Sequence, residues 1–244
     1  MKALIGIDAG HGGASSGTHS INSTADGLFE KDFALEQALL VEKMLLENGF
    51  GVVMTRRTDT NPGTVAKRAA LMAERKTDFA LSIHFNGYKD KSANGCEVFV
   101  PYGEKIAYIE KGFYSGFEKF FKLRKPFARS SDYYNSDNIF DKKLDLESGR
   151  FGAAAEKTDY FGFVRECWKN GISADLLEIC FLTNPKDFET YLQNREEIAK
   201  IIAKSIVEGF GETFVYEKPK EEIFQKPKIK KPLGYPRGLT FNFS

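Results

Sequence analysis

The chain contains 244 residues, of which 42% are hydrophobic and 28% are charged, a composition that suits one globular domain with a sizeable core and an appendage. The formal net charge is only +1, which excludes a strong overall field for binding nucleic acid or an anionic membrane surface. The three cysteines, Cys96, Cys167 and Cys180, are odd in number and too widely spaced for a disulfide framework or a CxxC metal site, so we expect buried thiols.

Taken in chain order, the hydrophobic pattern predicts short buried strands that alternate with amphipathic helices. Strands are expected at 3–8, 51–55, 78–83, 96–100, 160–164 and 174–180, and helices at about 31–48, 63–75, 104–121 and 195–212. The polar and aromatic stretch 122–159 shows no clear pattern, although SSDYYNSDN at 130–138 is typical of a loop. This alternation predicts an α/β fold, a mostly parallel twisted sheet of about six strands with helices on both faces.

The composition changes near Tyr216. Residues 217–244 carry seven Lys or Arg against three Glu, and they hold four of the eight prolines. Such a segment is typical of an extended linker or tail, so we expect the folded domain at 1–216 and a Pro/Lys-rich tail at 217–244. The apolar run before Asp8 is too short for the hydrophobic region of a signal peptide. No apolar run in the chain approaches the length of a membrane span. We therefore expect synthesis in the cytoplasm without a signal peptide and no membrane insertion.

Three chemically versatile residues each follow or end a predicted strand. His11 follows the first strand in LIGIDAGHGG, His84 follows the strand at 78–83, and Glu178 stands near the end of the strand at 174–180. In open parallel sheets, ligands bind outside the carboxyl ends of the strands. The sequence therefore predicts that two imidazoles and one carboxylate meet at one edge of the sheet.

Glu30, at the start of the first long helix, is a candidate fourth member. On its own it is explained as a first-turn acid favoured by the helix dipole. With His11 and His84 it completes a set of two imidazoles and one carboxylate, which would leave a tetrahedral Zn²⁺ one open position for water. The alternatives are a phosphate loop at His11, which lacks the GxxxxGK[ST] spacing, and a core histidine at His84.

Glu178 lies in the apolar run LLEICF. Burying a carboxylate there costs several kcal/mol unless it is paired, bound to a metal or protonated, which favours a role at the site. The remaining histidine, His19, follows no apolar strand and is interpreted as a loop residue.

These motifs, in this order, resemble the zinc-dependent N-acetylmuramoyl-L-alanine amidases (amidase type 3) of bacterial and phage cell-wall lysis. The resemblance rests on DAGHGG, a glutamate at a helix start, SIHFN and LLEICFLTN, and covers roughly residues 1–215. TRRTD at 55–59 followed by Arg68, and NGCEVFV, are similar to further family segments.

The resemblance implies a role for each matched residue. His11, Glu30 and His84 would hold one Zn²⁺, and Glu178 would be the catalytic acid/base. The bond cut would be the amide between the lactyl group of N-acetylmuramic acid and L-alanine in peptidoglycan. A zinc peptidase acting within the stem peptide and a non-catalytic wall-binding module are the alternatives.

The match to the family has departures. Cys180 stands where the family usually has glycine, and residues 101–160 are longer and more aromatic than in compact members. Asp8 and Asn86 also match motif positions and are expected to support the ligands or form turns. The basic tail is a candidate contact for anionic wall polymers or a remnant of a wall-binding region. Because no signal peptide is expected, a phage endolysin is favoured, with a secreted bacterial autolysin whose leader has been removed as the alternative.

Overall fold

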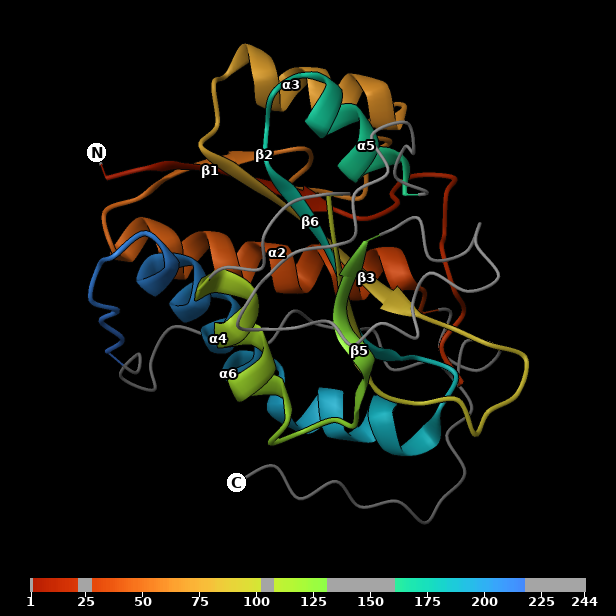
Figure 1. Cartoon of the computed structure of the whole chain (residues 1–244). Helices are drawn as coiled ribbons and strands as arrows, with labels where there is room; N and C mark the ends of the chain where they lie inside the picture. The colour runs from red at the N-terminus through yellow and green to blue at the C-terminus, as the bar shows by residue number, and fades with distance from the viewer. Residues whose placement is uncertain (1, 22–27, 102–107, 131–160, 218–244) are drawn as a thin grey trace.

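The structure, a computed structural model, describes residues 2–21, 28–101, 108–130 and 161–217. Its strands are β1 (Leu4–Ala9), β2 (Gly51–Met54), β3 (Phe79–Asn86), β4 (Cys96–Val100), β5 (Leu123–Ser130) and β6 (Ala174–Phe181). Its helices are α2 (Glu30–Glu47), α3 (Val65–Glu74), α4 (Tyr108–Phe117), α5 (Gly162–Lys169) and α6 (Pro185–Gly209). Figure 1 shows the sheet between two groups of helices.

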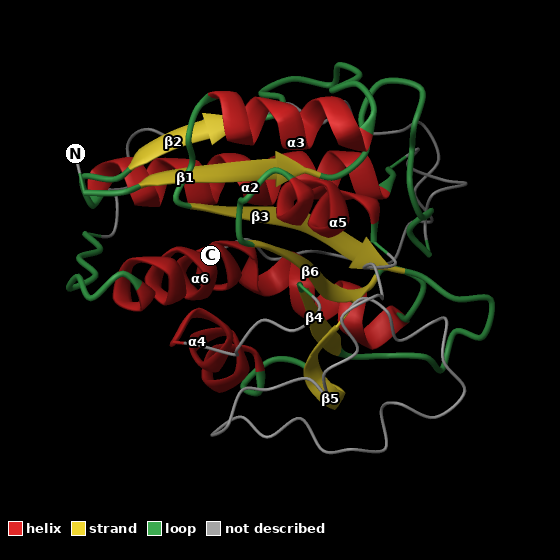
Figure 2. Ribbon diagram, turned by 45° about the horizontal axis from the view of Figure 1, so that its top comes forward, coloured by secondary structure: helices red, strands yellow, loops and turns green. Residues whose placement is uncertain are grey.

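The six strands form one sheet in the order β2-β1-β3-β6-β4-β5, which Figure 2 shows as a fan that twists from β2 to β5. Neighbours from β2 to β6 are parallel, whereas β4 runs antiparallel to β6 and β5 is parallel to β4. The mostly parallel twisted sheet is therefore confirmed. Because β1, β3 and β6 point the same way, their carboxyl ends share one edge.

Helices cover both faces of the sheet, as the alternating pattern predicts (Figure 1). One face carries α2, α4 and α6 over a large apolar core that includes Phe33, Phe113 and Ile202. The other face carries α3 and α5, where Met72 and Phe163 pack in a smaller cluster. Parallel strands buried on both faces need nearly continuous apolar sequence, which is why polar residues inside β1, β3 and β6 are informative.

One predicted element is wrong, and one strand was not predicted. Residues 160–164 are expected as a strand, but α5 begins at Gly162, with Phe163, Val164 and Cys167 buried on one side. Within the stretch 122–159, to which no pattern assigned an element, Leu123–Ser130 form the edge strand β5, which pairs with β4. The loop expected at 130–138 lies almost entirely outside the described residues. A short run rich in aromatic residues, such as 160–164, fits the periodicity of a strand as well as that of a helix. The sequence of β5 does not alternate between apolar and polar residues, so this strand is recognised only from its pairing with β4.

The last helix is longer than the apolar pattern indicates. It begins at Pro185, where the Asn184 side chain accepts hydrogen bonds from the amides of Lys186 and Asp187, and it kinks at Asn194. After α6 the chain returns to α2, where Val215 exchanges two hydrogen bonds with the Asn48 side chain. The tail beyond residue 217 lies outside the described residues, so the domain boundary near Tyr216 stays a prediction.

Two further expectations concern single features. All three cysteines are free and buried, as predicted. None of the helices in the described part of the chain combines the length and apolar character that crossing a bilayer requires.

Candidate metal centre

His11 lies in a tight turn directly after β1. Its own backbone is in the left-handed region at φ 60°, and the next two residues, Gly12 and Gly13, also have positive φ. The turn is anchored to β3 by a hydrogen bond of 3.0 Å from the Gly10 amide to the Ile83 carbonyl. Gly12 and Gly13 adopt positive φ without steric cost, so the turn directs the His11 imidazole across the edge of the sheet.

Close approach explains two of the surrounding glycines. A Cβ on Gly10 would lie 2.5 Å from Cε1 of His84, so that imidazole rests directly on the main chain of the turn. A Cβ on Gly17 would lie 2.5 Å from Oε2 of Glu30 and 2.7 Å from Cδ2 of His11. Any larger residue at either position would displace one of the candidate ligands.

Glu30 is the first residue of α2 and lies between the two imidazoles. Its Oε1 is 2.8 Å from Nδ1 of His84, and its Oε2 is 3.2 Å from Nε2 of His11. The backbone amides of Thr18 and Phe85 donate to the same carboxylate at 2.8 Å and 3.1 Å. The N-terminus of α2 adds a favourable dipole. The carboxylate is thus fixed in place by neighbours on three separate segments.

Electrostatics keeps Glu30 ionised despite its burial. Burial alone raises the pKa of this carboxyl group, but hydrogen bonds with His11 and His84 outweigh burial and hold the pKa far below its ordinary value. An ionised carboxylate is the form that binds a cation, because metal ligands must be deprotonated.

His11, Glu30 and His84 form a group whose ligand atoms all lie within 4.8 Å of one another. The two imidazoles meet edge to face, with ring centroids 4.9 Å apart. Oγ of Ser15 lies 3.0 Å from Nδ1 of His11, and such a partner orients a ligating imidazole so that its other nitrogen faces the ion. Two imidazoles and one carboxylate, held close together at the rim of the sheet, are a donor set that fits a divalent cation.

Glu178 lies beside this group. In the pairing of β3 with β6 it is the direct partner of His84, and paired residues on neighbouring strands point to the same face of the sheet. Its exposed fraction is 9%, so the carboxylate is largely removed from solvent. The structure therefore brings together all four residues that the sequence singled out.

The sequence reasoning missed a second carboxylate opposite Glu178. The antiparallel pairing of β4 with β6 makes Glu97 the direct partner of Glu178. Oε1 of the buried Glu97 accepts a hydrogen bond of 3.0 Å from the Asn86 side chain and lies 3.1 Å from Nε of Arg124. Its place inside the apolar strand CEVFV was the signal that could have found it.

Asp8, inside β1, supports the site by joining the elements that carry the candidate ligands. Its buried carboxylate accepts hydrogen bonds from Thr55, Arg68 and Ser82 at 2.8, 2.6 and 2.7 Å. Burial raises the pKa of Asp8, but the charge of Arg68 and the hydrogen bond from Ser82 lower it by a larger amount. The pKa of Asp8 is therefore below its ordinary value. Asp8 therefore ties β1 to β3 and α3 just before His11 and His84 emerge.

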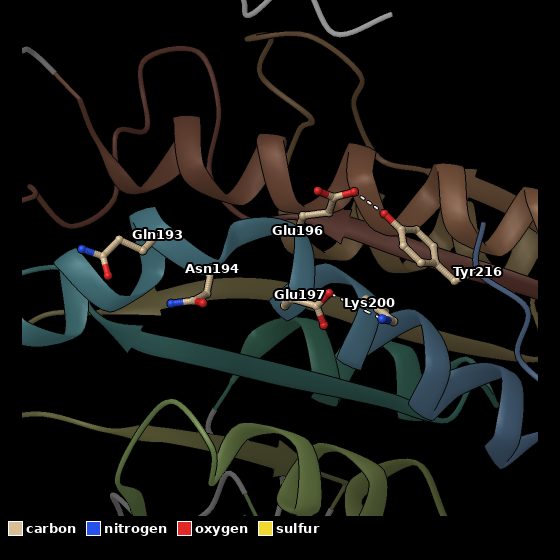
Figure 3. Close-up of a pocket in the computed structure, with 6 residues that line it drawn as sticks. All are labelled: Gln193, Asn194, Glu196, Glu197, Lys200 and Tyr216. Carbon is tan, nitrogen blue, oxygen red and sulfur yellow. Dashed lines mark hydrogen bonds and ion pairs between the residues drawn. The ribbon is translucent and has the colours of Figure 1, made fainter. Parts of the chain in front are cut away.

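Two other features are not part of the three-residue group. His19 is exposed and packs its ring against Phe29, the residue before Glu30, in keeping with its interpretation as a loop residue. A polar hollow of about 330 Å³ is formed where α6 meets the segment after it, and Figure 3 shows its lining by Gln193, Asn194, Glu196, Glu197, Lys200 and Tyr216. None of the candidate ligands lines this hollow, so it takes no part in the candidate centre.

Comparisons with known proteins identify relatives of this chain. Residues 5–210 match the family model described as N-acetylmuramoyl-L-alanine amidase. The chain is 34% identical over 208 residues to the "Probable cell wall amidase LytH" of Staphylococcus aureus, covering 85% of this chain and 57% of that protein. It is 32% identical over 121 residues to a germination-specific N-acetylmuramoyl-L-alanine amidase of Bacillus subtilis, covering 44% of this chain and 48% of that protein. The chain thus spans about half the length of these curated relatives.

Solved structures show the same fold. The catalytic domain of CwlV, an N-acetylmuramoyl-L-alanine amidase from Bacillus (Paenibacillus) polymyxa var. colistinus, superposes with a TM-score of 0.61 at 25% identity. That superposition covers 84% of this chain and 97% of the CwlV domain. Because the family model matches most of the chain and the sheet topology carries the expected residues to one edge, the chain belongs to the N-acetylmuramoyl-L-alanine amidase family.

Proposed function

We propose that this protein is a zinc-dependent hydrolase of bacterial peptidoglycan that cuts the amide between the lactyl group of N-acetylmuramic acid and L-alanine. The observation that carries the proposal is the group of His11, Glu30 and His84, with ligand atoms within 4.8 Å, beside Glu178 on the neighbouring strand. The names of the relatives support the choice of bond and of the cell wall as substrate.

The three donors would hold one Zn²⁺. When bound, such an ion lowers the pKa of a water ligand from 15.7 to about 7 and polarises a carbonyl oxygen, and both effects address the low reactivity of an amide. Two neutral imidazoles and one carboxylate leave a tetrahedral ion one position for water or substrate. A closed structural site would need a fourth protein ligand.

Glu178 would move the proton. Its carboxylate would accept a proton from the attacking water and then deliver it to the departing nitrogen of L-alanine, which cannot leave as an anion. The position of Glu178 favours this role, because it is largely buried and lies beside His84 at the edge of the sheet. Its alignment with His84 supports a position within reach of the reacting water.

Mass spectrometry of digested peptidoglycan tests the proposal. The purified protein should release intact stem peptides that begin with free L-alanine, leaving glycan strands with unsubstituted lactyl groups. A chelator should abolish release and added zinc should restore it. Fragments cut within the stem peptide would instead identify a zinc peptidase, and retention on the wall without any cleavage would identify a binding module.

A further inference from the structure

Arg56, in the segment after β2, has a side chain that donates to backbone carbonyls on three sides. Nε donates to Ala9 at 3.0 Å, and Nη2 donates to Gly10 at 2.8 Å and to Lys31 at 2.7 Å. Nη1 donates to Thr58 at 3.3 Å. The exposed fraction of Arg56 is only 4%. A buried guanidinium with this many main-chain acceptors is fixed in orientation, because its five donors form a rigid planar fork.

The acceptors belong to the two segments that carry candidate metal ligands. Ala9 and Gly10 immediately precede His11, and Lys31 immediately follows Glu30. One nitrogen, Nη2, contacts both segments at once. The Arg56 side chain therefore bridges the turn after β1 and the first turn of α2, which are otherwise separate in the chain.

The side chain of Arg56 also packs against the turn that contains His11. A Cβ on Gly12 would lie 2.9 Å from both Cδ and Nε of Arg56, so the turn packs directly on this side chain. The left-handed backbone of His11 lies in the same turn and costs conformational energy that neighbouring contacts must offset. On the outer side the turn is tied to solvent-facing groups, since Lys31 Nζ donates to Gly13 at 2.9 Å and to Asp59 at 2.6 Å.

Burying the charged side chain of Arg56 costs free energy that a purely structural role would not explain. Burial disfavours the charged guanidinium and lowers the pKa of Arg56. Within the described residues Arg56 makes no ion pair within 4.0 Å, so its charge is stabilised by carbonyl dipoles and, at longer range, by the carboxylates of Asp59, Asp8 and Asp32. The next residue, Arg57, shows the ordinary arrangement, with a half-exposed side chain paired to Glu42 at 2.6 Å.

We propose that Arg56 is a positioning residue that sets the separation of His11 and Glu30 and thereby the affinity and coordination geometry of the metal centre. The proposal rests on the zinc site of the proposed function. Within the described residues Arg56 forms no hydrogen bond to a metal-binding atom of His11, Glu30 or His84. It acts through the main chain on both sides of the ligand pair, as groups behind metal ligands generally do.

The proposal is tested by the zinc affinity of the purified, metal-stripped protein. This affinity is measured by competition with a chromogenic chelator, well below the unfolding temperature. Arg56→Met removes the charge and the donors, whereas Arg56→Lys keeps the charge but replaces the planar fork with one ammonium nitrogen, which cannot stand in for Nε, Nη1 and Nη2 together. Both should bind zinc about 10–100-fold more weakly than the wild type, the usual effect of losing such a supporting group. Arg57→Met, the neighbouring control, should bind with unchanged affinity.

The visible spectrum of the Co²⁺-substituted protein gives a second readout. The ligand-field bands of Arg56→Lys should differ in position or intensity from those of the wild type and of Arg57→Met, because the ligand geometry has changed. Wild-type affinity and spectrum in a folded Arg56→Lys would overturn the proposal. Failure of the wild type itself to bind zinc or Co²⁺ would instead refute the metal centre of the proposed function.

Discussion

Replacing Gly10 by alanine tests whether the His84 imidazole must rest on the turn after β1. The new Cβ would lie 2.5, 2.6 and 2.7 Å from Cε1, Nε2 and Nδ1 of that ring. Ordinary contact begins near 3.4 Å, so ring or turn must retreat by about 0.9 Å, several times the tolerance of about 0.2 Å for a metal–ligand distance. The ring has little freedom to do so, because Nδ1 is also held 2.8 Å from Glu30.

We therefore expect Gly10→Ala to fold but to bind zinc about 100-fold more weakly, at the upper end of what supporting groups contribute. The measurement is chelator competition on metal-stripped protein, with thermal unfolding recorded for each variant.

Gly6→Ala is the matched control for this experiment. It lies in the same strand, and its new Cβ would lie 2.4 Å from the flexible Met72 thioether. Overpacking of this kind costs about 1–3 kcal/mol of folding stability, but it should leave zinc affinity unchanged. A folded Gly10→Ala with wild-type affinity would refute the idea that close contact with Gly10 positions His84.

Three further outcomes are expected. Glu178→Gln should keep zinc but lose a factor of about 10²–10⁴ in rate of amide cleavage, the usual range for a positioned acid/base, and undiminished activity would rule out that role. In metal-free protein, Asp8 has a folded pKa below its ordinary 3.8, so its ionised form stabilises the fold above 3.8 and that contribution is lost as pH falls toward the folded value. Acid titration of the free energy of unfolding should therefore be flatter for Asp8→Asn than for the wild type across this window, and equal slopes would contradict the assignment. Burial raises the pKa of Cys167 to about 12, and those of Cys96 and Cys180 are also raised. Ellman's reagent at pH 8 should find no reactive thiol in native protein and three after unfolding, whereas rapid native reaction would show that these side chains are accessible.

Much of the fold was predictable because its signals are local. The stripe of apolar residues in α2 and the continuous apolar runs of β1 and β6 are read within one segment, and the structure places these elements within a residue or two of expectation. His11 and His84 were recognisable as candidate site residues because both accompany such strands, whose carboxyl ends must share an edge in a parallel sheet. The proximity of Glu30 and Glu178 to them followed from the same topology.

Tertiary structure decided what depends on partners distant in the chain. β5 is a strand because β4 offers it hydrogen-bonding groups, and α5 is a helix because its apolar side faces the sheet, although its sequence also fits a short strand. Glu97 faces Glu178 because β4 runs antiparallel to its neighbour, a choice that no local pattern records. Arg56 is held by hydrogen bonds to main-chain carbonyls. Every residue has a main-chain carbonyl, so the sequence does not show which of them Arg56 contacts. Periodicity along one segment therefore determines which elements form, whereas the pairing of strands and the burial of charges are settled only when those elements meet.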